Sequence, residues 1–232
     1  MNLNKTAKNL LNNSFILKLF LPYNCKKLMA FTLAEVLITL LIIGVVASLV
    51  VPALIQNTQQ AEYIVAWKKA YGIIFQTQLN MVRDYGSVSG AFSNIDNTPI
   101  GGNNFMNSWL HYLSITKICS AGRIISDGCH TKNFVGLDGN IMFYNSGTHE
   151  ASVILNDGTF INFYSGMCDG GSVCSDSNLF IDVNGVKGPN IVGRDVFRMR
   201  YIPQKDRFIA GNGADATCSG TGWNCGAYYL SH

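Results

Sequence analysis

The chain has 232 residues, a net charge of +3 and seven cysteines, which indicates one domain with accessory segments. The charge changes sign along the sequence: residues 1–30 contain five lysines and no acidic side chain, whereas the remainder carries 12 basic and 14 acidic residues. A basic leader before a mildly acidic body is typical of a targeting segment. The interleaved arginines and aromatic residues of a nucleic-acid-binding surface are missing, so no nucleic-acid partner is predicted.

The first predicted element is a membrane-spanning helix. From Leu33 to Ile55 the sequence is almost wholly apolar, and at about 1.5 Å per residue this run is long enough to cross a hydrocarbon core. The lysines before it place the N-terminus in the cytoplasm. Because a cleavable secretory signal has an apolar region of only about 7–15 residues, the run favours an anchor. One acidic residue, Glu35, lies near its start.

The helical pattern continues beyond the apolar run. An apolar stripe at helical spacing is interrupted by Gln78, which predicts a second half with one face to bury. The stripe consists of Ile64, Trp67, Tyr71, Ile74 and Val82. A single long helix, kinked at Pro52 and ended near Gly86, is the simplest interpretation.

The rest of the chain predicts a small antiparallel sheet. A loop rich in Gly, Ser and Asn leads to a short amphipathic helix with Phe105, Trp109 and Leu113 at a spacing of four. Asp138-Gly139 and Asp157-Gly158 each lie between β-favouring runs, which is a hairpin signal. "NLFIDVNG" and "VFRMRYI" predict further strands. The expected fold class is α+β, with the long N-terminal helix packed on an antiparallel sheet.

The cysteines predict an oxidising compartment. Cys25 lies in the basic leader, and the other six follow the apolar run: Cys119, Cys129, Cys168, Cys174, Cys218 and Cys225. Their spacing favours three local bridges, 119–129, 168–174 and 218–225, although six cysteines permit about 15 pairings. Free thiols or a zinc site are the alternatives, but there is no Cys-x-x-Cys pair or clustered Cys/His spacing. Disulfides imply that this part of the chain is extracytoplasmic.

The stretch "AFTLAEVLITLLIIGVVA", which begins at Ala30 after two lysines and two further residues, resembles the prepilin cleavage and methylation motif of the type IV pilin and type II secretion pseudopilin superfamily. The resemblance implies that a prepilin peptidase/N-methyltransferase cuts between Ala30 and Phe31 and that Phe31 is N-methylated. Glu35 would then be the fifth residue of the mature chain. Ala30 stands where the family usually has glycine, and the leader is longer than a minimal one.

The resemblance also implies a domain plan and a role. The plan is a removed leader (1–30), a transmembrane and assembly helix (31–55), its amphipathic continuation (56–86) and a pilin-like extracytoplasmic domain (87–232). The expected role is a non-enzymatic structural subunit of a type II secretion pseudopilus or a type IV pilus-like fibre. Its partners would be other pilin or pseudopilin subunits and the assembly platform of the bacterial inner membrane, where the subunit is a single-pass protein before it enters the fibre.

Glu35 needs a reason to lie in an apolar run. A charged side chain at the centre of a membrane helix costs about 2.5–3.5 kcal/mol, and less near the edge. Cleavage would create a positive amine on Phe31, and in the family this glutamate meets the N-terminal amine of a neighbouring subunit. Two such charges attract strongly in a medium of low dielectric constant. The alternative is that Glu35 reaches the lipid headgroups and has no role in assembly.

Calcium is the cofactor that the sequence suggests. Asp182, Asn184, Asn190 and Asp195 lie among glycines, and Asp-x-Asn-Gly resembles the opening of a calcium loop. The resemblance to core pseudopilins, which bind calcium in their C-terminal region, favours such a site. The EF-hand pattern is not matched, and the same residues are ordinary turn formers.

The remaining residues give no catalytic signal. The histidines are scattered and predicted on the surface or in loops, namely His111, His130, His149 and His232. Neither a nucleophile elbow, a phosphate-binding loop nor a His-Glu-x-x-His motif occurs in the sequence. The second hypothesis is a membrane-anchored extracytoplasmic enzyme or ligand-binding module, which would keep its anchor uncleaved and carry a convergent polar site within residues 105–232.

Overall fold

The computed structural model describes residues 31–93, 102–130, 133–143, 150–165, 177–211 and 217–232, and the prediction for Ala30 lies outside them. The chain forms two compact units, Met1–Ala53 and Leu54–His232. The elements are α1 (Leu33–Tyr85), α2 (Val88–Ser93), α3 (Gly102–Leu110), β1 (Ile115–Cys119), β2 (Phe134–Val135), β3 (Ile141–Phe143), β4 (Glu150–Leu155), β5 (Phe160–Tyr164), β6 (Asn178–Asp182), β7 (Val196–Ile202), a 3₁₀ turn (Pro203–Lys205), β8 (Arg207–Ala210) and α4 (Cys225–Ser231).

Helix α1 begins as an apolar segment and is long and apolar enough to cross a membrane. In the first unit every described side chain is exposed. Pro52 lies inside α1, whose helix assignment is unbroken there, and the kink predicted at this residue stays a prediction. The helix ends before Gly86, which has a φ of +79° and donates its N–H to Val82 O at 2.8 Å. A left-handed glycine directly after the last turn is a common helix terminator.

In the second unit, α1 buries one face against the sheet. Trp67, Ala70, Ile74 and Met81 belong to the main hydrophobic core, at the spacing of three and four residues expected for one helix face. The predicted place of Val82 in this stripe was wrong, since Val82 is 42% exposed and the preceding residue, Met81, is fully buried. The prediction was off by one residue because, at 3.6 residues per turn, either position 81 or position 82 can continue the apolar stripe.

Gln78 is buried within this apolar face because its side chain forms hydrogen bonds with the backbone of the edge strand β8. Phe208 N–H donates to Gln78 Oε1 at 2.6 Å, and Gln78 Nε2 donates to Phe208 O at 3.4 Å. The side-chain amide therefore pairs with the backbone of β8 much as a neighbouring strand would, which satisfies polar groups that burial would otherwise leave unpaired.

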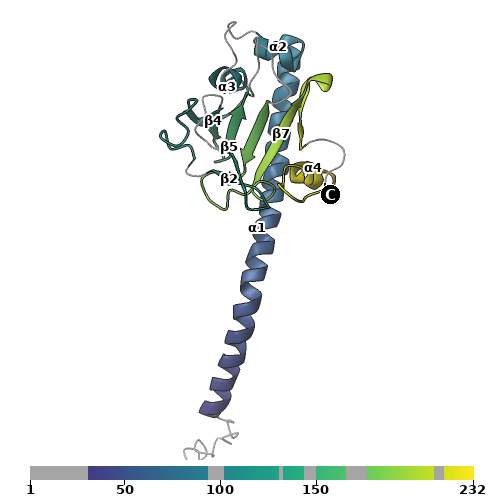
Figure 1. Ribbon diagram of the computed structural model, residues 1–232. Helices are drawn as coiled ribbons and strands as arrows, with labels where there is room; N and C mark the ends of the chain where they lie inside the picture. Colours follow the sequence, from purple (N-terminus) through teal and green to yellow (C-terminus); the bar gives the residue numbers. More distant parts are fainter. Residues whose placement is uncertain (1–30, 94–101, 131–132, 144–149, 166–176, 212–216) are drawn as a thin grey trace, which may run out of the picture. The chain divides into compact units, whose positions relative to one another are not determined.

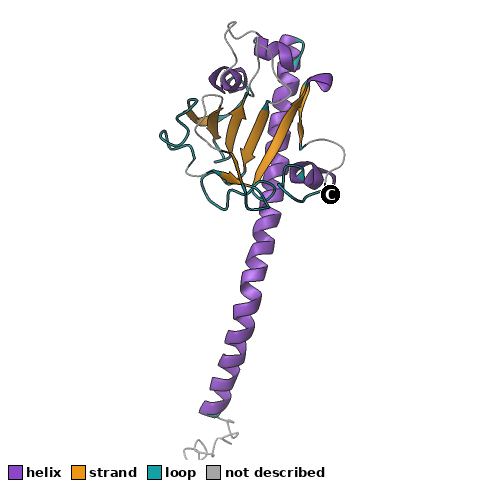
Figure 2. Ribbon diagram, viewed as in Figure 1, coloured by secondary structure: helices purple, strands orange, loops and turns teal. Residues whose placement is uncertain are grey.

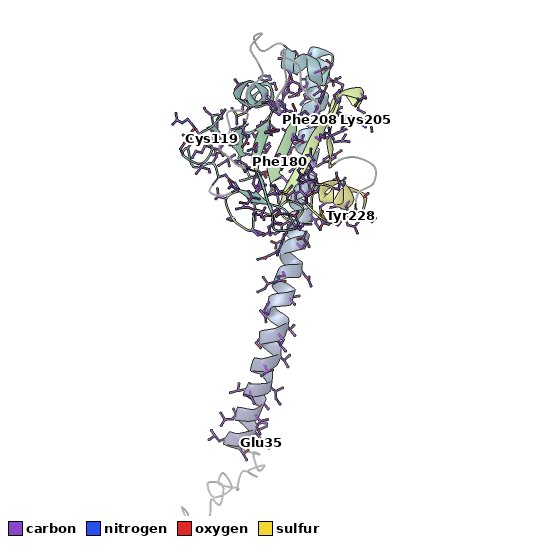
Figure 3. The ribbon with its side chains drawn as sticks, viewed as in Figure 1. Glu35, Cys119, Phe180, Lys205, Phe208 and Tyr228 are labelled. Atoms are coloured by element: carbon purple, nitrogen blue, oxygen red, sulfur yellow. A yellow bond between two sulfur atoms is a disulfide. The ribbon has the colours of Figure 1, made fainter. Side chains whose placement is uncertain are left out.

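The second unit is built on a six-stranded sheet of order β1-β4-β5-β6-β7-β8 (Figure 1), with β2 and β3 as a separate pair. All of the strand pairs are antiparallel. Figure 2 shows the strands of this unit lying across helical segments, and α3 contributes Phe105 and Trp109 to the same core as α1. The ring of Phe208, labelled in Figure 3, packs on Phe105 and Trp109, with ring centroids 5.7 and 5.5 Å apart, respectively. The predicted α+β class with an antiparallel sheet is confirmed.

Both predicted hairpins are present. Asp138-Gly139 connects β2 to β3, and Asp157-Gly158 connects β4 to β5. Gly139 and Gly158 have φ values of +81° and +87°, which glycine adopts without a steric penalty. The sequence did not predict β1, β8, α2 or α4, and the expected amphipathic helix was wrong at its end, since α3 stops at Leu110, before Leu113, and Ile115–Cys119 is strand β1. Helix α2 lies in the predicted loop, where the Asp206 carboxylate accepts the N–H groups of Val88 and Ser89 at 2.7 and 2.9 Å.

The opposite face of the sheet carries a second, smaller core. It contains Cys119, Cys129, Ile124 and Phe134 together with Phe160, Phe180, Val192 and Val196. The structure contains disulfides Cys119–Cys129 and Cys218–Cys225, which are two of the three local pairings that the spacing favours. Cys168 and Cys174 lie outside the described residues. The first bridge holds the loop after β1 over the sheet, since both of its cysteines are fully buried.

Glu150, at the start of β4, is a buried carboxylic acid. Only 6% of the residue is exposed, and among the described residues no hydrogen bond reaches its Oε2. Burial raises the pKa of Glu150 to about 8, although a hydrogen bond with the Asn162 side chain acts to lower it. The protonated form is therefore the stable one in the folded protein at neutral pH.

The free energy of unfolding is expected to fall as the pH rises from 5 to 8. The folded-state pKa of Glu150 lies above the ordinary value of 4.5, so its stabilising contribution is complete below pH 4.5 and is lost as the pH rises through 8. The Glu150→Gln variant should lose about 1–3 kcal/mol of this pH dependence in denaturant titrations of the detergent-solubilised chain. Glu62→Gln, at an exposed site, should keep the wild-type slope. An unchanged slope in Glu150→Gln would contradict the assignment.

Candidate functional site

The first candidate site is the start of α1. Glu35 lies in the first helical turn (Figure 3) and is the only charged side chain between residues 31 and 61. Thr32 precedes the helix and hydrogen-bonds with Glu35 three times, through its backbone N–H and its hydroxyl group. Phe31 is 83% exposed. The start of α1 thus presents an exposed aromatic residue and a single carboxylate, ahead of an almost wholly apolar surface.

The second candidate site is the loop between β6 and β7, where the structure brings the four predicted calcium ligands together. Asp182, the last residue of β6, is fully buried. Its Oδ1 accepts the Asn184 N–H at 3.2 Å, and its Oδ2 lies 3.2 Å from His130 Nε2. Burial raises the pKa of Asp182 to about 7, against the opposing hydrogen bond from His130, and the nearby Asp195 raises it further.

Asp195 closes the same loop from its other end. It is fully buried, and its two oxygens accept the N–H groups of Asn190 and Ile191 at 2.8 and 2.7 Å. Burial raises the pKa of Asp195, and these two backbone hydrogen bonds act to lower it. Asn190 has a φ of +60°, a left-handed conformation that asparagine tolerates better than most residues.

Two side-chain amide groups in this loop, those of Asn190 and Asn184, have oxygen atoms that could bind a cation. Asn190 presents its amide to two acceptors, Asp182 Oδ2 at 3.1 Å and Lys187 O at 3.3 Å, and its nitrogen donates to both. A cation at this point would let the Asn190 oxygen turn toward it instead. Asn184 Oδ1 is buried and, within the described residues, has no hydrogen-bond partner. An unpaired buried oxygen calls for an explanation, and an unseen ion is one.

The donor set fits a hard cation through the Asp182 carboxylate together with amide and carbonyl oxygens. No group of three His, Cys, Asp or Glu side chains is placed to hold a metal among the residues that the structure describes. Calcium accepts such mixed oxygen ligands, and here Asp182, Asn184, Asn190 and a backbone carbonyl could supply them. A cavity of about 450 Å³ beside the loop, lined in part by Asn184, Gly185 and Lys187, gives room for water and ions to enter.

His130 lies outside the helices and strands, between β1 and β2, as the loop alternative of the prediction allows. It is not on the surface, however: it is fully buried and pairs with Asp182, 52 residues later in the chain. Its ring packs 4.8 Å from Phe160 and 5.0 Å from Phe134. Sequence spacing carries no signal for this pair, because the contact is created by the disulfide loop folding over the sheet. His149 lies outside the described residues.

Comparisons with known proteins give no relative from which a function could be transferred. The chain matches no family model, no curated protein and no solved structure. The function therefore has to be argued from the residues and geometry of the chain itself.

Proposed function

We propose that the chain is a pilin-like structural subunit, a pseudopilin, that is cleaved before Phe31, N-methylated and assembled into a type II secretion pseudopilus or a type IV pilus-like fibre. The observation that carries the proposal is Glu35. It is the single charge at the start of a long apolar helix, and it follows a basic leader, the small residue Ala30 and Phe31.

The fold is compatible with this role. A helix with an apolar first part continues into a unit where it packs on an antiparallel sheet. The same helix exposes further apolar side chains within the second unit, namely Val65, Phe75, Leu79 and Val82 at 41–69% exposure. A self-assembling subunit would cover such positions with its neighbours.

The proposal also names partners and a place. The chain would be a single-pass protein of the bacterial inner membrane. A prepilin peptidase/N-methyltransferase would cleave it between Ala30 and Phe31 and methylate the new N-terminus of Phe31. Other pilin or pseudopilin subunits and the assembly platform would then receive it. The disulfides of the second unit fit an oxidising, extracytoplasmic compartment.

A membrane-anchored enzyme or ligand-binding module is the rival function. It would use residues 105–232 as a site and α1 only as an anchor. The polar cluster at Asp182 is the nearest approach to a site in that range, but His130 and Asp182 are fully buried and out of reach of a substrate in this conformation. An anchor also does not need the combination of Ala30 and Phe31 with Glu35.

The deciding experiment is the intact mass and N-terminal sequence of the chain from membranes made with and without the prepilin peptidase. We expect a chain that starts at N-methylated Phe31 only when the peptidase is present. A chain that keeps Met1, or is cut elsewhere, would contradict the proposal and favour the anchored module.

We further propose that the loop from Asp182 to Asp195 binds calcium, because the buried Asn184 Oδ1 has no hydrogen-bond partner among the described residues and the Asp182 carboxylate and the Asn190 amide lie in the same loop. Millimolar calcium should raise the melting temperature of the detergent-solubilised chain by about 5 °C relative to chelator, as expected when a ligand saturates the folded state alone. Asn184→Ala should abolish the shift, and Asn140→Ala, in the exposed β2–β3 turn, should keep it. No shift in the wild-type chain would remove calcium from the proposal.

A further inference from the structure

Glu35 is held by Thr32 before any neighbour is present. The Thr32 N–H and the Thr32 hydroxyl both donate to Glu35 Oε2, at 2.8 and 2.9 Å. In return, the Glu35 N–H donates to Thr32 Oγ1 at 3.2 Å. This reciprocal pairing of a threonine with a glutamate three residues later is a capping box, which satisfies backbone N–H groups that the first helical turn cannot pair.

The pairing uses only one of the two carboxylate oxygens. All of the Thr32 contacts with the carboxylate converge on Oε2, and no hydrogen bond within the described residues reaches Oε1. A free glutamate side chain loses conformational entropy when a partner fixes it. Here that entropy is already lost in the separate subunit, so a cation arriving at Oε1 meets a carboxylate whose position is set.

We propose that Thr32 is a positioning residue for assembly: its capping box holds Glu35 at the helix start with Oε1 available to the Phe31 ammonium group of a neighbouring copy. This inference rests on the proposed function and goes beyond it. The Glu35 charge supplies the attraction, and Thr32 supplies the geometry in which that attraction acts. An interaction between preorganised groups costs less to form than one between mobile groups.

A purely structural cap would act differently from a positioning residue. If Thr32 only started the helix, its loss would weaken α1, membrane insertion or cleavage, and would do so whether or not residue 35 carried a charge. If Thr32 acts through Glu35, its loss matters only while the charge is present. The two roles are therefore separated by a double-mutant cycle.

The experiment compares Thr32→Ser, Thr32→Val, Glu35→Gln and the double variant in full-length chain with the peptidase. Cleavage is measured by intact mass, and assembly by the fraction of cleaved chain in sedimented fibres. Serine keeps the hydroxyl group and should assemble within about twofold of wild type, whereas valine has the shape of threonine without its hydroxyl and should assemble about fivefold less, the factor that a typical cap is worth. Cleavage should be unchanged in both.

In the Glu35→Gln background, Thr32→Val should cause no further loss. An equal loss in both backgrounds, or a loss of cleavage instead of assembly, would overturn the positioning role. Hydrogen exchange of the Glu35 amide in the uncleaved chain tests the cap without any fibre: Thr32→Val should speed it and Thr32→Ser should not. Unchanged exchange in Thr32→Val would overturn the inference even if fibres form. Wild-type chain that is neither cleaved nor assembled would instead defeat the proposed function, and with it this inference.

Discussion

Replacing Trp67 by alanine is expected to lower the free energy of unfolding of the second unit by about 3–5 kcal/mol, the range for removal of a fully buried aromatic side chain. Trp67 is completely buried and stacks on Phe197 of β7, with ring centroids 4.8 Å apart. Its Nε1–H donates to Gly226 O at 2.9 Å. One side chain of α1 thus joins the sheet to the C-terminal helix α4.

The groups packed around Trp67 can move only a little to fill the cavity that its removal would leave. A Cβ atom added to Gly226 would lie 3.0 Å from Trp67 Cζ2, so the α4 backbone rests directly on the indole ring. Alanine would leave a cavity on that side and an unpaired carbonyl group. Because interiors are close-packed, neighbouring groups relax only in part to fill such a cavity.

Denaturant titration of the detergent-solubilised chain measures this effect. Trp67→Phe is the matched variant: it keeps a ring for Phe197 but loses the hydrogen bond to Gly226, and should cost about 1–3 kcal/mol. Leu79→Ala, on the exposed side of the same helix, should change stability little. A loss below about 1 kcal/mol for Trp67→Ala would contradict the central place given to this residue.

Local signals account for the parts of this fold that the sequence predicted. The Asp157-Gly158 turn and the flanking β-favouring runs are readable because a hairpin depends on neighbours in the chain. The two described disulfides join cysteines only ten and seven residues apart. The long helix is readable because its apolar run and its stripe repeat at a helical period.

The parts that were missed depend on contacts between distant residues. Gln78 looked like a break in the apolar stripe, yet it pairs with the backbone of Phe208, 130 residues later. The sequence of β8, Arg-Phe-Ile-Ala, does not alternate between polar and apolar residues, so it gives no strand signal. The strand forms because it pairs with β7 and with the side chain of Gln78. The buried partnership of His130 with Asp182 likewise arises only once the disulfide loop covers the sheet.

The candidate sites divide in the same way. Glu35 could be singled out from the sequence because a lone charge in an apolar run is costly wherever the helix goes. Its capping by Thr32 is also written in the sequence, as a threonine and a glutamate three residues apart. The four residues of the β6–β7 loop were predicted as a group, but the use of Asp195 to bind two backbone N–H groups is visible only in the structure.

The largest effect on assembly is expected from Glu35→Val. The change removes the only charge between residues 31 and 61, so membrane insertion should be retained or improved, since a buried charge costs about 2.5–3.5 kcal/mol at the membrane centre. Incorporation into fibres should fall at least about tenfold, because close charge pairs at protein interfaces couple by about 1.5–7 kcal/mol. Membrane insertion and fibre assembly are thus predicted to change in opposite directions.

Three comparisons make the result specific to the Glu35 carboxylate. Cleavage before Phe31, measured by intact mass, should be unchanged, which separates assembly from processing. Glu62→Val removes an exposed acid from the same helix and should leave assembly near the wild-type level. Glu35→Asp keeps the charge on a side chain one methylene shorter, and should assemble better than valine but less well than wild type.

Each alternative role for Glu35 predicts a different pattern. If the carboxylate only reaches toward the headgroups, valine should improve anchoring and leave fibres intact. If α1 is the anchor of an enzyme or ligand-binding module, no fibre depends on residue 35 and the variant should behave as wild type in every assay except membrane affinity. Stronger insertion together with lost assembly is expected only if the cost of placing Glu35 in the membrane is offset by a cation that a neighbouring subunit brings to it.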